Sequence, residues 1–165
     1  MKIYALTTLQ RYAIEIQVRL FNNVKQCQKE YDLLIKDFEN NKDYIINKGI
    51  KNTEIEYNES PEILVSIQTY ELNDVINNQV YCVIRGNQDC YEIGNENLYL
   101  FNDKTKANEK FLDLYILYNE YGYDVKTEKN TKYFSFDNNN DDWGHCKTEL
   151  IKIESKVKKW VSIIK

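Results

Sequence analysis

The sequence predicts an α+β fold of two tandem ββαβ(β) units, each an antiparallel sheet covered by one helix, followed by a C-terminal helix. Three observations carry this prediction. A short motif recurs after 80 residues, the segments before it alternate apolar and polar residues as strands do, and the segments after it repeat apolar residues at helical spacing. With 165 residues, 42% of them hydrophobic, the two units have enough apolar surface to pack as one compact domain.

The first unit is predicted over residues 1–74. It opens with a β-type run at residues 3–6 and a second strand at residues 12–21, where aliphatic residues alternate with charged and amide side chains. A helix follows, with Asn22 or Asn23 as its cap, and a strand at residues 64–72 closes the unit.

The second unit is predicted over residues 79–155, after a short boundary at residues 74–79. Its strands are expected at residues 80–83, 91–101 and 147–153. Because the boundary is short, we expect two closely packed halves rather than two separate domains.

The repeat is clearest in the two helices. An offset of 80 residues places Leu20-Phe21-Asn22 on Leu100-Phe101-Asn102, and Asn102 or Asp103 caps the second helix. Four apolar pairs follow at intervals of four, three and four, which is one face of an amphipathic helix. They are Cys27 with Ala107, Tyr31 with Phe111, Leu34 with Leu114, and Phe38 with Tyr118.

The last segment, residues 154–165, has no counterpart in the first unit. Val157, Trp160, Val161 and Ile164 fall on one helical stripe. A C-terminal helix is therefore predicted, which either caps the core or contacts a partner, including a second copy in a homodimer.

The unit resembles the small uncharacterised ββαβ proteins of phages and low-GC bacteria. The residues that carry this resemblance are Val80-Tyr81, Leu100-Phe101-Asn102, Ala107 and Glu149-Leu150, and the first unit departs from it with Cys27 in place of Ala. The resemblance implies a fold and transfers no catalytic residue. The abundance of Asn, Ile, Lys and Tyr is likewise typical of an AT-rich genome.

Charge and hydropathy narrow the class of protein. Residues 1–146 carry 16 basic and 24 acidic side chains, a net of −8, whereas residues 147–165 are net +4. An acidic body with three arginines argues against direct binding of duplex nucleic acid, which needs clustered cations. No apolar run approaches the roughly 20 residues of a membrane span, and residues 1–4 show no signal-peptide pattern. We expect a cytoplasmic protein.

No common catalytic or cofactor motif is present. The five glycines form no phosphate loop, and G-x-S-x-G is missing. His145 and Cys146 are neighbours that point to opposite faces of a strand, so His145 reaches another cysteine only through the tertiary fold. The cysteines form no C-x-x-C, and Cys82 and Cys90 are expected as reduced thiols facing each other across a hairpin. We expect no enzyme, no metal and no cofactor.

Two clusters are candidates for partner binding. Residues 137–145 hold three carboxylates and three amides, which suit a polar hairpin loop, an acidic contact surface with an adjacent tryptophan, or a hard-cation site. A group of tyrosines near the end of the second helix is divided between core and surface. The predicted partner-binding residues are Asp137, Asp141, Asp142, Trp143, Tyr115, Tyr121 and Tyr123.

These features favour a non-enzymatic acidic protein that inhibits a basic partner. The class expected first is an anti-defence protein of a phage or mobile element, anti-CRISPR-like, which blocks a nucleic-acid-handling effector by steering toward its cationic groove. An immunity protein of a nuclease toxin fits the same pattern. A binder of a small nucleotide signal that uses Arg11, Arg19 and Arg85, and a housekeeping module, remain alternatives.

Overall fold

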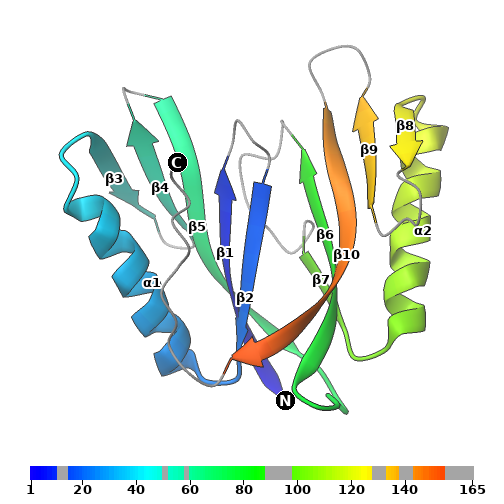
Figure 1. The fold of residues 1–165 in the computed structure, drawn as a ribbon, viewed down its shortest axis with the longest axis horizontal. Helices are drawn as coiled ribbons and strands as arrows, with labels where there is room; N and C mark the ends of the chain where they lie inside the picture. The colour runs from blue at the N-terminus through cyan, green and yellow to red at the C-terminus, as the bar shows by residue number, and fades with distance from the viewer. Residues whose placement is uncertain are drawn as a thin grey trace.

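The computed structural model describes residues 1–10, 15–49, 52–57, 60–87, 98–127, 133–137 and 143–154. In these residues ten strands form one mixed sheet, and two helices cover its outer sides (Figure 1). Neither helix combines the length and the apolar character that crossing a bilayer requires.

The first half is a hairpin, a helix and a three-stranded meander. The last strand of the meander returns beside the first strand of the hairpin, so the strand order is β3-β4-β5-β1-β2 and all neighbours are antiparallel. The helix α1 crosses from one edge of this half to the other. The elements are β1 (Lys2–Gln10), β2 (Glu15–Phe21), α1 (Val24–Glu39), β3 (Tyr44–Lys48), β4 (Asn52–Tyr57) and β5 (Ser60–Glu71).

The second half has the same connectivity. Its strand order, β8-β9-β10-β6-β7, places each strand where its counterpart lies in the first half. The elements are β6 (Gln79–Asn87), β7 (Leu98–Phe101), α2 (Lys104–Glu120), β8 (Asp124–Thr127), β9 (Tyr133–Asp137) and β10 (Trp143–Glu154).

The halves join at the end of β10, where Ile153 and Glu154 pair in parallel with Leu20 and Phe21 of β2. The sheet folds on itself there, so that the inner faces of its halves pack together and the helices lie on opposite outer sides (Figure 1). Both halves contribute to this central core. Its buried members are Ile3, Ala5, Leu9, Ile16, Leu20, Leu64, Val80, Cys82, Ile84, Leu98, Leu100 and Ile153.

Each helix covers its own outer core. Because strand residues alternate between faces, β1 sends Leu6 toward α1 and β6 sends Val83 toward α2. The four predicted pairs of helix positions are buried or half-buried in these cores, which confirms the predicted core stripe. The caps are Asn23 and Asp103, whose side chains accept hydrogen bonds from backbone N–H groups of the first helical turn.

The predicted fold class is wrong. The chain is mostly strand, the two halves share one ten-stranded sheet, and each half has three strands after its helix rather than one or two. The additional strands are four to six residues long, so each offers few residues from which to establish a hydrophobic pattern. The predicted C-terminal helix begins with Glu154, which instead ends β10, and residues 155–165 lie outside the described residues.

Candidate functional site

The acidic stretch is described in part. Asp137 is the exposed last residue of β9, where it pairs with Asp124 of β8 and with Trp143, the first residue of β10. Asp141 and Asp142 lie outside the described residues. The structure therefore places one of the three predicted carboxylates at the end of β9, between two paired strands.

The predicted tyrosines divide between core and surface. The ring of Tyr115 meets Phe134 edge-on at 5.6 Å, and Tyr123 meets Phe136 in the same way at 5.6 Å, so both rings pack in the core under α2. Tyr121, the residue that ends α2, is 71% exposed. Of these three rings, the structure leaves that of Tyr121 on the surface.

The described cysteines are buried, unpaired core thiols. Burial raises the pKa of Cys27 to about 12, and the nearby Glu30 adds to this effect. Burial likewise raises the pKa of Cys146 to about 12, although Arg85 and Lys110 oppose it, and it raises the pKa of Cys82 as well. These thiols stay protonated at neutral pH and are poor nucleophiles. Cys90, and with it the predicted pairing across the hairpin, lies outside the described residues.

His145 has a structural environment. It lies on β10 between Gly86 of β6 and Ser135 of β9, and its ring stacks on Tyr133 at 5.7 Å. Within the described ranges, no three His, Cys, Asp or Glu side chains come together as they would to hold a metal ion.

A shallow pocket of about 300 Å³ opens at the start of α2, and its lining is mixed in character. Lys104 is its one cation, and Asp103 already occupies the free N–H groups of the helix terminus. Of the three arginines, Arg19 is bound to two carboxylates and Arg11 lies outside the described residues. This pocket thus offers a nucleotide phosphate one lysine and no arginine.

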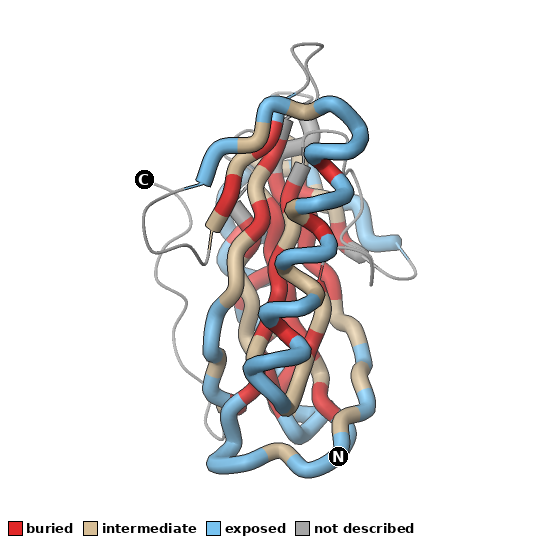
Figure 2. Tube along the Cα trace, turned by 90° about the vertical axis from the view of Figure 1, so that its right-hand side faces the viewer, coloured by how far each residue is buried: buried red, intermediate tan, exposed pale blue. Residues whose placement is uncertain are grey.

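The most unusual surface is the outer side of α2. Leu112, Ile116, Leu117 and Tyr121 are 53%, 45%, 36% and 71% exposed, and we call these four residues the α2 outer face. Figure 2 looks onto α2 and shows exposed residues along its outer side with the buried strands behind it. A helix that is apolar on its outer side as well as its inner side is ordinarily covered on both sides.

The helix α1 provides an internal comparison for this surface. At the 80-residue offset, the positions of Leu112, Ile116 and Leu117 are occupied in α1 by charged residues. Both helices cover their half-sheets with the same four core positions, so packing does not require apolar residues on the outer side. The α1 counterparts are Asp32, Lys36 and Asp37.

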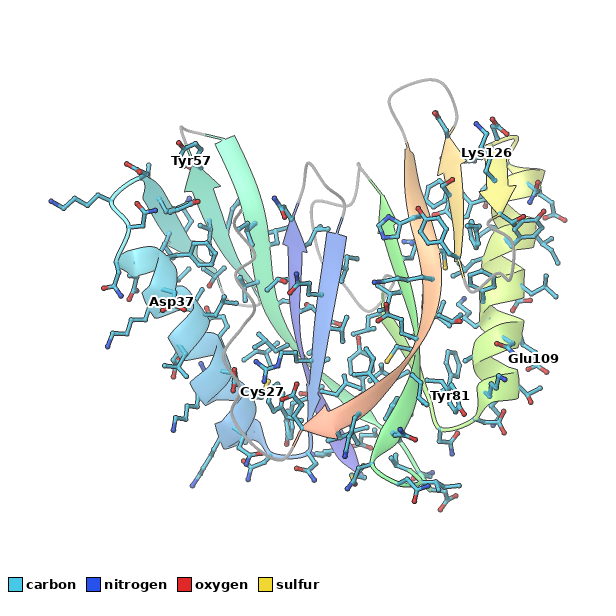
Figure 3. All side chains as sticks on the ribbon, in the orientation of Figure 1. Cys27, Asp37, Tyr57, Tyr81, Glu109 and Lys126 are labelled. Carbon is cyan, nitrogen blue, oxygen red and sulfur yellow. The ribbon has the colours of Figure 1, made fainter. Side chains whose placement is uncertain are left out.

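Three exposed carboxylates accompany the apolar residues. Glu109, Asp113 and Glu120, which we call the acidic row, lie along one line of α2 and fall within about 40° of helix rotation of each other. In the part of the chain that the structure describes, no ion pair engages them. Figure 3 shows Glu109 pointing away from the sheet and Cys27 on the sheet side of α1.

Sequence reasoning named Tyr121 but missed the other three residues of the α2 outer face, because they are indistinguishable in type from those of the core. The signal that reveals this face is the same 80-residue offset, when it is used to compare the outward-facing residues of α2 with those of α1. No protein-family model, curated protein or solved structure matches the chain.

Proposed function

We propose that this protein is a non-enzymatic inhibitor that acts in the host cytoplasm and binds a basic protein through α2. The single observation that carries the proposal is the α2 outer face, where exposed Leu112, Ile116 and Leu117 occupy positions that are charged in α1. Exposed apolar residues beside charged ones are typical of surfaces that bind other proteins.

Charge supports the class of partner. The net charge of −8 over residues 1–146 attracts cationic surfaces and raises the rate of association with them. Effectors that handle nucleic acid carry such surfaces, because they must neutralise phosphates. The proposal is therefore an anti-defence role, anti-CRISPR-like, in which the protein occupies an effector and keeps it from its nucleic acid.

The test is inhibition of defined effectors. The protein is purified and added to a panel of nuclease-based defence effectors, and nucleic-acid cleavage is measured. The panel includes nuclease toxins, which distinguish an immunity protein from an anti-defence protein. We expect cleavage by at least one defence effector to stop, and to resume with the triple variant Leu112→Asp, Ile116→Lys, Leu117→Asp, which gives α2 the outer residues of α1.

The matched control is Leu33→Asp, because Leu33 is an exposed leucine on the outer side of α1. It should inhibit as the unmodified protein does. An unmodified protein that leaves every effector active contradicts the proposal, and so does a triple variant that inhibits without loss.

A further inference from the structure

The α2 outer face has the dimensions of a helix contact. Its first and last residues, Leu112 and Tyr121, are nine positions apart, which is about 14 Å along the helix axis. Leu112 and Ile116, four residues apart, form one ridge on which the apolar side chains of a second helix can pack, and Leu117 and Tyr121 form another on the far side of the acidic row. An extended peptide needs an unpaired strand edge instead, and this surface presents none.

The acidic row on α2 favours a positively charged ligand. Glu109 and Asp113 are four residues apart, a like-charge spacing that destabilises a helix. The row of carboxylates runs between Leu112 and Ile116 on one side and Leu117 on the other. The lysines of α2 lie in its first two turns, where the ammonium of Lys110 rests over the ring of Tyr99 at 4.4 Å.

We infer that the α2 outer face binds a basic amphipathic helix of the partner protein, an inference that rests on the proposed function. Apolar side chains of that helix cover the ridge of Leu112 and Ile116. Lysines or arginines along one side of its apolar stripe pair with Glu109, Asp113 and Glu120. This one ligand would both cover the exposed apolar side chains and neutralise the neighbouring carboxylates.

Two other occupants fit less well. A second copy of the chain would bring the acidic row against its own equivalent, which is repulsive. The chain's own residues 155–165 are basic, but they follow Glu154, whose carboxylate is bound to Arg19 beside α1. That is the opposite outer side of the molecule from α2 (Figure 1).

The experiment uses synthetic peptides as probes. A fluorescent peptide of leucines and lysines, with leucine at helical spacings of three and four, is titrated with the full chain and followed by fluorescence anisotropy. We expect binding that weakens about tenfold between about 50 mM and about 300 mM salt, because the contact is partly ionic. A peptide with glutamate in place of lysine should not bind.

Variants separate the apolar and ionic parts of the contact. Leu112→Asp with Ile116→Lys should weaken binding at least about tenfold, equal to about 1.4 kcal/mol. The triple variant Glu109→Gln, Asp113→Asn, Glu120→Gln should keep weak binding that no longer responds to salt. The control Leu33→Asp should bind as the unmodified protein does, and thermal unfolding verifies that each variant is folded.

Four results would overturn the inference. The first two are that the glutamate peptide binds equally well and that the α2 variants bind undiminished. The third is a dimer in sedimentation that Leu112→Asp dissociates. The fourth is tighter peptide binding by Trp160→Lys, which would make the C-terminal segment the occupant.

The two proposals fail separately. If the α2 variants lose inhibition but the lysine peptide does not bind, the helix inference is wrong and the inhibitor role stands. If the peptide binds but no effector is inhibited, the inhibitor role is wrong.

Discussion

At the scale of single residues, one buried ionic cluster holds three elements together. The guanidinium of Arg19 on β2 bonds both carboxylate oxygens of Glu154 on β10, at 2.9 and 2.7 Å, and reaches Glu30 on α1 at 2.6 Å. Burial opposes the charge of Arg19, but Glu154 and Glu30 outweigh it and raise its pKa above the ordinary value. Glu30 is fully buried, and its carboxylate accepts a hydrogen bond from this guanidinium.

Replacing Arg19 should therefore be costly. Arg19→Met leaves the carboxylate of Glu30 buried without its cation, and we expect a loss of about 3–5 kcal/mol in the free energy of unfolding, measured by urea titration. The double variant Arg19→Met, Glu30→Leu removes the stranded charge and should lose less than Arg19→Met alone. A double variant as unstable as the single one would show that the cost lies in packing rather than in charge.

The two helix caps are an amide, Asn23, and a carboxylate, Asp103. Because only the carboxylate titrates, their contributions to stability should respond differently to low pH. Backbone N–H groups of Lys106 and Thr105 donate to Asp103 and lower its pKa. The charged cap thus stabilises the fold above the unfolded pKa of about 3.9, and this contribution is lost as pH falls through the lower folded value. α1 uses Asn23 at the equivalent position, which does not titrate.

We predict that Asp103→Asn, which gives α2 the cap of α1, is less sensitive to acid than the unmodified protein. Chemical unfolding at a series of pH values from about 6 to about 2 measures the difference. The stability advantage of Asp103 over Asn should shrink steadily below about pH 4. Parallel curves for the two proteins would contradict this prediction.

At the scale of elements, the sequence predicted the helices well and the short strands poorly. Both helices have a capping residue and four core positions at regular spacing, so local signals agree with the final packing. The strand β8 has four residues, of which one, Val125, packs against the core. Such a strand is specified by its pairing with β9 and not by its own pattern, and that pairing is set only when the chain folds.

Equivalent core positions should respond alike to the same substitution. Leu34 and Leu114 are both buried at the same place in their helices, and we expect Leu34→Ala and Leu114→Ala each to lower the free energy of unfolding by about 2–5 kcal/mol. Leu112→Ala, on the outer side of α2, should change it by less than about 0.5 kcal/mol. Urea unfolding of the three variants checks this. A large loss of unfolding free energy in Leu112→Ala would mean that another part of the same chain packs against the outer side of α2.

At the scale of the whole molecule, the exposure of Leu112, Ile116 and Leu117 was out of reach of sequence patterns for a physical reason. α2 has apolar residues on its inner side and on both flanks of the acidic row, so residue type alone does not say that Leu112 and Ile116 stay exposed. The tertiary fold decides it, by turning Leu114 and Tyr118 inward and leaving Leu112 and Ile116 outside. The same dependence on tertiary pairing explains why the single folded sheet was not foreseen. Its closure needs Ile153 to meet Leu20 from the opposite end of the chain.

The shared central core makes the two halves one cooperative unit. β1, β2 and β5 fill one side of that core and β6, β7 and β10 the other, so neither half keeps its inner face covered without its neighbour. We predict a single unfolding transition, with far-ultraviolet circular dichroism and hydrogen exchange of both halves giving the same midpoint.

The variant Ile84→Ala tests this coupling from one side. Ile84 is buried in the central core on β6, and its truncation should lower the unfolding free energy by about 2–5 kcal/mol. Amides of β1 and β5 in the other half should lose protection by the same amount, because they open only when the whole molecule unfolds. Ile46→Ala, in the periphery of the α1 core, should have a smaller effect. Loss of protection confined to β6, β7 and β10 would show instead that the halves unfold separately, each stabilised chiefly by its own helix.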